Sequence, residues 1–429
     1  MVSHKLYRDI SYNGVASYLM GPFQPEKSFD TNIVERRLPM KILLVSYYPL
    51  PHPGGIWTFV SRLKERLERL GHTVDILSHT PDTTKYRIIG HQPEISISQL
   101  SSYINEHLTK TFPTLHLNYW IFHTEVYRYS LELSSLYYGL DQYDIIHAQD
   151  VIAARAMSRV KPKNTPLVTS AHGFLSMEVF YVLKTLYPHK TEHQHLDSFE
   201  YHYHKTLEFL GYQSSDFIHT QSSWMRNNAI NEFSVSPDKL FTFPYGMDVE
   251  GFLQPSSTKL PSQDKKIILY MGRLVYLKGI HHLIDALALL KSDRNDWECW
   301  ILGDGDLKGE LQFQCQRLGL ENGVKFLGLT NDILPFLKQA DIFVLPGLQD
   351  TQPHSVMEAQ LSGVPVIVSD AAGLPEMVIN GENGLVAAAG NSHQLYLHLK
   401  YLLDNPLIRT QLANRAKEWA QDRWSMDKM

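Results

Sequence analysis

Short apolar runs alternate with amphipathic stretches along the chain from Met40 onwards. Residues 42–46 (ILLVS) have the length and branching of a buried parallel strand. Residues 57–70 place apolar side chains at steps of three and four, which predicts a helix with one face on a sheet. Residues 73–77 (TVDIL) then begin a second strand. A strand, a loop rich in Pro and Gly, a helix and a strand predict a βαβ unit.

The helix predicted over residues 57–70 has two distinct faces. Its apolar positions are expected to pack on the sheet, namely Trp57, Val60, Leu63, Leu67 and Leu70. Its polar positions are expected in solvent, namely Arg62, Lys64, Glu65 and Arg66. The cations of this face, together with Arg69, also suit an anionic membrane surface, so peripheral membrane contact stays open as an alternative.

Two more strands are predicted in this part of the chain, over residues 145–147 and 167–170. The stretch from Thr84 to Tyr138 is aromatic and irregular, and its pattern assigns no elements. Residues 254–264 (QPSSTKLPSQD) have the composition of a linker.

Beyond this linker the alternation of strands and helices restarts. The predicted strands cover residues 267–271, 297–302, 324–327, 342–345 and 364–368. The predicted helices cover residues 280–290 and the stretch through Leu311 and Leu318. This order predicts an α/β fold with two Rossmann-like, doubly wound domains, whose parallel sheets face each other across a cleft. The expected organisation is an N-terminal extension over residues 1–39, a first domain over 40–250 and a second over 251–429.

Charge and composition exclude several classes of protein. Forty Lys and Arg against 45 Asp and Glu give a net charge of −5, so no basic excess favours a nucleic-acid partner. Only two cysteines occur, Cys299 and Cys315, which excludes a disulfide framework and favours buried thiols in a reducing compartment. No apolar run approaches the roughly 18 residues of a membrane span, and residues 1–39 lack the apolar stretch of a secretory signal. A cytoplasmic protein is expected, with the inner face of the membrane as an alternative location.

The segment from Asp350 to Glu358 (DTQPHSVME) follows a predicted strand and enters a helix. The backbone N–H groups of His354, Ser355 and Val356 would point outward at the helix start, which suits a phosphate or pyrophosphate. Glu358 can accept hydrogen bonds from a ribose diol, and Asp350 can accept them from sugar hydroxyls. The alternative is helix capping and a solvated helix face.

A second segment, Gly272 to Gly279 (GRLVYLKG), places Arg273 and Lys278 directly after a buried strand. Both side chains can reach the same diphosphate, Arg in bidentate fashion and Lys as a point charge. Two cations at this position can stabilise a phosphate leaving group, as Mg²⁺ does elsewhere. The alternative is a pair of surface charges beside a turn.

Several motifs follow one another in a fixed order: Gly54-Gly55, Arg273 with Lys278, Gly303-Asp304-Gly305, Phe326-Leu327-Gly328, and Asp350 to Glu358 before Gly363-Val364-Pro365. Over about residues 40–424 this array resembles the retaining glycosyltransferases of the GT-B fold, family 4. The resemblance implies a nucleotide-sugar donor held mainly by the second domain and an acceptor bound mainly by the first. It also implies front-face displacement, in which the leaving phosphate oxygen takes the acceptor's proton, with no metal or cofactor required.

The resemblance assigns roles to individual residues. Arg273 and Lys278 match the pair that grips the diphosphate, and Glu358 matches the carboxylate at the ribose. Asp350 stands where the family has Glu, and His172 matches a His near the donor sugar. The implied catalytic residues are Arg273, Lys278, Asp350 and His172, and the implied donor-binding residues are Gly54, Gly55, Gly272, Gly303, Phe326, Leu327, His354, Ser355, Val356 and Glu358.

Three further segments are compared with the family pattern. Phe326-Leu327 matches the backbone segment beside the base. Tyr245-Gly246-Met247-Asp248 stands where the family often has Asn-Gly-Val-Asp. Trp424-Ser425 resembles the beginning of the family's last helix, which returns toward the first domain. Because the sequence ends at Met429, this helix is expected to be short.

Two motifs suggest metal binding without a strong pattern. Asp304-Gly305-Asp306 has the spacing of a chelating pair but lies in a Gly-rich loop between a strand and a helix. Five histidines crowd residues 189–204, where a solvated polar helix is favoured over a zinc site: His189, His193, His195, His202 and His204. No metal site is expected.

The expected function is transfer of a sugar from a nucleoside-diphosphate sugar to a sugar, lipid-linked or small-molecule acceptor, as in glycan, glycolipid or glycoconjugate biosynthesis. A nucleotide-sugar epimerase or a phosphorylase on the same fold is one alternative. A non-catalytic protein that binds nucleotide sugars or assists assembly is the other, because Asp350 replaces the family's Glu.

Overall fold

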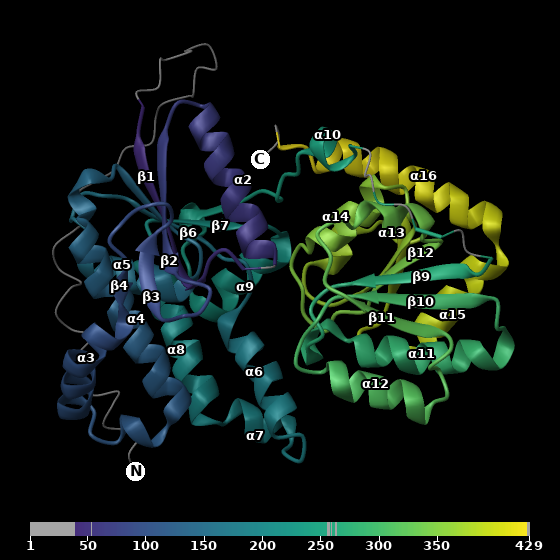
Figure 1. Ribbon diagram of the computed structural model, residues 1–429, viewed down its shortest axis with the longest axis horizontal. Helices are drawn as coiled ribbons and strands as arrows, with labels where there is room; N and C mark the ends of the chain where they lie inside the picture. The colour runs from purple at the N-terminus through teal and green to yellow at the C-terminus, as the bar shows by residue number, and fades with distance from the viewer. Residues whose placement is uncertain (1–38, 53, 255–257, 259, 262–263, 427–429) are drawn as a thin grey trace. The chain divides into compact units, whose positions relative to one another are not determined.

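The computed structural model describes residues 39–426 except 53, 255–257, 259, 262 and 263. Most of the extension predicted over residues 1–39 and part of the predicted linker therefore lie outside the described residues. The chain from Met40 to Met429 forms one unit of mutual contacts, and both sheets belong to it. We call residues 40–250 the N-terminal half and residues 251–429 the C-terminal half (Figure 1).

The N-terminal half contains an eight-stranded sheet in the order β4-β3-β2-β1-β5-β6-β7-β8. Its strands are parallel, except that β3 runs antiparallel to β2 and to β4. Leu44, at the centre of the sheet, pairs with Ile76 on one side and His147 on the other. The strands are β1 (Lys41–Pro49), β2 (Thr73–His79), β3 (Lys85–Ile88), β4 (Ile95–Ser96), β5 (Ile145–Ala148), β6 (Leu167–Ser170), β7 (Phe217–Thr220) and β8 (Leu240–Thr242).

The C-terminal half contains a six-stranded, wholly parallel sheet in the order β11-β10-β9-β12-β13-β14. The chain reverses its direction of winding between β9 and β12, and ligands of such sheets bind beyond the carboxyl ends of the strands at this point. The strands are β9 (Lys266–Met271), β10 (Trp297–Leu302), β11 (Val324–Gly328), β12 (Ile342–Leu345), β13 (Val366–Ser369) and β14 (Gly384–Ala387).

Helices connect most of the parallel strands in both halves (Figure 1). In the N-terminal half they are α2 (Gly55–Arg69), α3 (Ile97–Thr111), α4 (Tyr119–Tyr138), α5 (Val151–Val160), α6 (Leu175–Leu186), α7 (Glu192–Leu196), α8 (Phe199–Ser214), α9 (Ser223–Phe233) and α10 (Val249–Phe252). In the C-terminal half they are α11 (Ile280–Asp293), α12 (Lys308–Arg317), α13 (Leu334–Gln339), α14 (His354–Leu361), α15 (Ser392–Asp404) and α16 (Pro406–Arg423). None of the helices within the described residues combines the length and apolar character that crossing a membrane requires.

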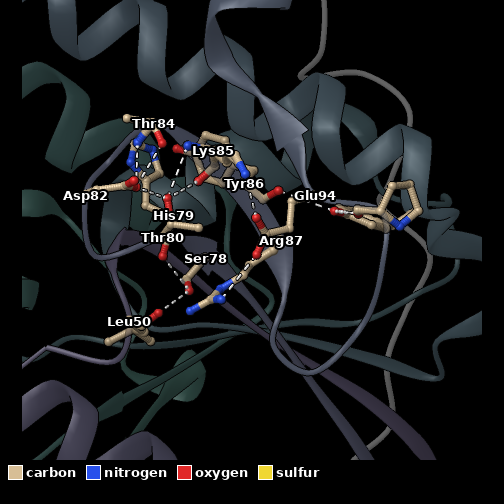
Figure 2. A network of polar contacts seen from close by, with 12 residues as sticks. Leu50, Ser78, His79, Thr80, Asp82, Thr84, Lys85, Tyr86, Arg87 and Glu94 are labelled. Carbon is tan, nitrogen blue, oxygen red and sulfur yellow. Dashed lines mark hydrogen bonds and ion pairs between the residues drawn. The ribbon is translucent and has the colours of Figure 1, made fainter.

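The stretch from Thr84 to Tyr138, which the sequence pattern left unassigned, contains β3, β4, α3 and α4. Asp82 organises the turn from β2 into β3, because its carboxylate accepts hydrogen bonds from Thr80 and Thr84 (Figure 2). Glu94 then pairs with Lys85 and Arg87 of β3. Side-chain hydrogen bonds and ion pairs fix this short antiparallel edge, so apolar periodicity gave no signal for it.

Two predictions for helix α2 are wrong. Leu70 was expected in the core but is 59% exposed, because the helix ends at Arg69 and Leu70 lies at its C-terminal cap. Arg62 was expected in solvent but is half-buried, and its Nη1 atom is enclosed without a hydrogen-bond partner among the described residues. Phe59, one turn earlier, is buried and extends the apolar face toward Arg62.

The histidine-rich segment is only partly solvated, contrary to the prediction. His195 and His204 are each 2% exposed, because α7 and α8 turn these side chains into the protein. Within the described chain no group of three or more His, Cys, Asp or Glu side chains is arranged to hold a metal ion. Cys299 and Cys315 are buried, as predicted.

The C-terminal segment also differs from the prediction. Trp424 does not begin a helix but follows α16, whose 18 residues end at Arg423. The indole N–H of Trp424 donates to Gln360 Oε1 at 2.9 Å, and Ser425 forms an isolated parallel bridge with Met247. The tail is therefore fixed by one buried side chain and by strand-like pairing with the segment after β8.

Candidate functional site

Three loops at the carboxyl ends of β9, β10 and β12 pack backbone against backbone. Gly303 has a φ of +147°, and a Cβ on it would lie 1.9 Å from the carbonyl oxygen of Gly272. Gly279 has a φ of +66°, and a Cβ on it would lie 1.9 Å from the carbonyl oxygen of Pro346. Only glycine permits both the conformation and the close approach. These contacts hold the segment from Gly272 to Lys278 against the loop that leads to Asp350.

We expect Gly303→Ala to weaken binding of a nucleoside diphosphate at least about tenfold, because the new Cβ must push the loops after β9 and β10 apart. Titration calorimetry of the purified variant measures this affinity. Gly309→Ala is the matched control, since a Cβ at Gly309 in α12 meets no atom within 4 Å and alanine favours the helix. Equal affinities for the two variants would contradict a donor site beside Gly303.

Lys278 and Asp350 form an ion pair, although 72 residues separate them in the sequence. Lys278 ends a short 3-10 helix, η4 (Tyr276–Lys278), and the carbonyl oxygen of Leu277 accepts the N–H of Leu348 at 2.7 Å. The other carboxylate oxygen of Asp350 accepts the N–H of Thr351 at 3.1 Å. Both charged side chains are largely withdrawn from solvent, so removing either partner would leave the other charge buried without compensation.

Arg273 occupies a different position from its predicted partner Lys278. Its side chain is exposed, and its carbonyl oxygen accepts a hydrogen bond from the hydroxyl of Tyr270 at 2.9 Å. Its positive charge acts on Tyr48 near the end of β1: burial raises the pKa of Tyr48 well above the usual value, and Arg273 lowers it in part. Arg273 is therefore available to an anion that enters from solvent, whereas Lys278 is already paired.

The start of α14 is built from His354, Ser355 and Val356. The N-cap residue is Pro353, which has no side-chain oxygen to cap the helix. The amide of Val356 already donates to the carbonyl of Pro353 at 3.2 Å, so this amide does not point outward as predicted. A Cβ on Gly55 would lie 3.6 Å from the ring of His354, so the Gly54-Gly55 loop of the N-terminal half adjoins this helix start.

Glu358, one turn into α14, has an unusual protonation equilibrium. Burial raises the pKa of its carboxyl to about 7, and the positive charge of Arg62 acts in the opposite direction. Burial, assisted by Arg62, also lowers the pKa of His354 to about 4, so His354 is neutral. The sequence pattern does not mark Arg62 as a site residue. The signal available was its position three residues after Phe59 and one before Leu63, at the border of the apolar face.

His172 follows β6 and is held from several sides. Its two ring nitrogens bond to the hydroxyl of Tyr245 and to Gln149 Oε1, the latter at 3.4 Å. Its carbonyl oxygen accepts the hydroxyl of Thr351 at 3.1 Å, next to Asp350 in the C-terminal half. Burial holds the pKa of His172 well below its ordinary value. The structure thus brings His172, Lys278 and Asp350, three of the four predicted catalytic residues, into one connected group.

Phe326 and Leu327, the residues predicted to lie beside the base, belong to β11, the strand next to β10. The amide of Gly303 donates to the carbonyl of Gly328 at 2.8 Å, which ties the Gly303 loop to the end of β11. On β11, Phe326 packs against the core while Leu327 is 41% exposed. A carboxylate oxygen of Asp304 accepts the amide of Gly305 at 2.9 Å, which is a local role for the first acid of the Asp-Gly-Asp motif.

Comparison with known proteins agrees with this architecture. The family model for glycosyltransferase family 4 matches residues 53–250, and the model for glycosyl transferases group 1 matches residues 255–419. An uncharacterized glycosyltransferase of Methanocaldococcus jannaschii is 27% identical over 402 residues, which cover 90% of this chain and 95% of that protein. The glycogen synthase of Mycobacterium tuberculosis is 25% identical over 401 residues, which cover 88% of this chain and 90% of that protein.

Solved structures are similar over the same length. Sucrose-phosphate synthase from Thermosynechococcus elongatus matches with a TM-score of 0.69 at 20% identity, over 90% of this chain and 96% of that chain. Anabaena HepE, solved in complex with UDP-glucose, matches with a TM-score of 0.62 at 20% identity and the same coverage. The chain therefore belongs to the family 4 glycosyltransferases, and its two parallel-sheet halves have the GT-B fold.

Proposed function

We propose that the protein transfers a sugar from a nucleoside-diphosphate sugar to an acceptor with retention of the anomeric configuration. The observation that carries this proposal is the group formed by Lys278, Asp350 and the start of α14 at the carboxyl ends of β9 and β12. As the resemblance to family 4 implies, the C-terminal half binds most of the donor and the N-terminal half binds most of the acceptor. The complex of Anabaena HepE with UDP-glucose supports UDP-sugars as the first donors to test.

In the proposed reaction, the bond between the anomeric carbon and the diphosphate oxygen breaks. The acceptor oxygen bonds to the same face of that carbon, and its proton passes to the leaving diphosphate oxygen. Lys278, Arg273 and the amides of His354 and Ser355 stabilise the negative charge that develops on the diphosphate. These groups supply the positive charge, so the reaction is proposed to need no metal ion.

The carboxylates and the histidine are proposed to hold the donor in place. Asp350 accepts hydrogen bonds from hydroxyls of the sugar, and Glu358 accepts hydrogen bonds from the hydroxyls of the ribose. The loop of Gly54 and Gly55 adjoins the start of α14, where the diphosphate is expected, and offers backbone without side chains. Phe326 and Leu327 lie beside the base. His172 is neutral and lies beside the sugar as an orienting group.

The experiment has two stages. A thermal-shift screen against UDP-, GDP- and ADP-sugars identifies the donor, because a ligand of the native state raises its melting temperature. The selected donor is then incubated with sugar, lipid-linked and small-molecule acceptors, and NMR determines the anomeric configuration of the product. We expect a retained configuration and an unchanged rate in EDTA. An inverted product, or loss of activity in EDTA, would overturn the proposed mechanism.

A further inference from the structure

Tyr245 lies at the centre of a cluster of rings and is 5% exposed. Its ring centroid is 4.9 Å from that of Phe59 on α2 and 5.6 Å from that of His172. It stacks on His354 at 5.5 Å with an interplanar angle of 12°. Its amide donates to Gln352 Oε1 at 2.9 Å. The backbone and the ring of Tyr245 are therefore both fixed, and its hydroxyl has a defined direction.

The hydrogen bonds around His172 determine which ring nitrogen carries the proton. Gln149 uses its amide nitrogen to donate to the carbonyl of His147 at 3.2 Å, so its Oε1 faces His172. A carbonyl oxygen only accepts, which requires a proton on Nε2 of His172. Burial keeps the ring neutral, so Nδ1 carries a lone pair and accepts the hydroxyl of Tyr245.

We infer that Tyr245 and Gln149 are positioning residues that hold His172 as the Nε2–H tautomer, with both ring nitrogens engaged. This inference rests on the proposed function, since it concerns how His172 acts on the donor sugar. With both nitrogens bonded to protein, His172 neither takes nor gives a proton in the reaction. Its role is to keep a fixed orientation beside Thr351 and Asp350. Proton transfer from the acceptor to the leaving phosphate then proceeds without this histidine.

Tyr245→Phe tests the hydroxyl alone, because the phenyl ring keeps the contacts with Phe59 and His354. We expect kcat to fall about five- to tenfold, as for the loss of one buried hydrogen bond, with UDP affinity unchanged within twofold. The ¹⁵N NMR signal of His172 Nδ1, assigned by its absence in His172→Gln, should shift because this nitrogen loses its hydrogen bond, while Nε2 stays protonated. Tyr138→Phe is the control, since its hydroxyl bonds to the carbonyl of Pro93 away from the site.

Gln149→Leu removes the acceptor for Nε2–H, so kcat should fall by a similar factor and the His172 ¹⁵N signals should shift from a single tautomer toward a mixture. The double variant with Tyr245→Phe should lose less kcat than the product of the two single losses, because both residues act on one ring. Unchanged ¹⁵N signals and kcat in Tyr245→Phe would overturn the inference, and so would a parallel loss of UDP affinity and thermal stability. The NMR signals report the tautomer of His172 even when the protein transfers no sugar. A wild-type protein with a single His172 tautomer but no transfer would therefore refute the proposed function and leave the tautomer assignment intact.

Discussion

Lys278→Ala is expected to lower kcat/KM for sugar transfer by at least about 100-fold, comparable to removal of one preorganised charge-stabilising donor. Of the two cations predicted to bind the diphosphate, Lys278 is the one withdrawn from solvent, where it forms an ion pair with Asp350. Its loss removes charge from the diphosphate and also leaves Asp350 buried without a counter-charge. Steady-state kinetics with a saturating acceptor measure the effect, and UDP affinity measured in parallel separates binding from catalysis.

Lys308→Ala is the matched control for this prediction. Lys308 also pairs with an aspartate of the C-terminal half, Asp304, but at the surface and at 3.5 Å. Exposed pairs of this kind contribute little, so activity and stability should remain near those of the wild type. Near-normal kcat/KM in Lys278→Ala would locate the leaving-group site elsewhere in the protein.

The sequence predicts well what short-range pattern and topology determine. The strands at 167–170, 297–302 and 342–345 have the predicted bounds, because each is a short run with apolar or β-branched residues at most positions. The proximity of Lys278 and Asp350 follows from a topological rule, since both follow strands whose carboxyl ends meet. The strand predicted at 364–368 begins two residues later, at Val366, because Gly363 and Pro365 still belong to the turn.

The sequence does not reveal contacts between side chains that lie far apart along the chain. Arg62 belongs to a helix face that looks solvated, but the structure brings its charge close to Glu358 of α14. Tyr245 stands where the family often has Asn, and Gln149 lies outside the compared motifs, so the sequence does not show that their hydroxyl and carbonyl groups reach His172. His195 and His204 are buried by the packing of α7 and α8, which a polar local sequence conceals.

Glu358→Ala is expected to lower kcat/KM at least about 100-fold, and the wild-type affinity for UDP should depend on pH through the same residue. Ribose hydroxyls donate to an ionised carboxylate, so binding favours the deprotonated form of Glu358. With a pKa of about 7, affinity should rise roughly tenfold from pH 6 to pH 8 and then level off. Glu358→Gln should abolish the rise of affinity that depends on Glu358. The pH dependence that remains in this variant measures the ionisation of the nucleotide itself.

Arg62 gives this prediction its sharpest test. Because its charge lowers the pKa of Glu358, Arg62→Gln should move the midpoint of the affinity profile to higher pH, and binding at pH 7 should weaken. Arg69→Gln is the matched control on the same helix, since Arg69 is exposed and pairs with Glu65. Calorimetric titrations of all four proteins between pH 5.5 and about 8.5 decide the matter. A midpoint that stays in place in Arg62→Gln, or a pH dependence that survives in Glu358→Gln, would show that another group controls nucleotide binding.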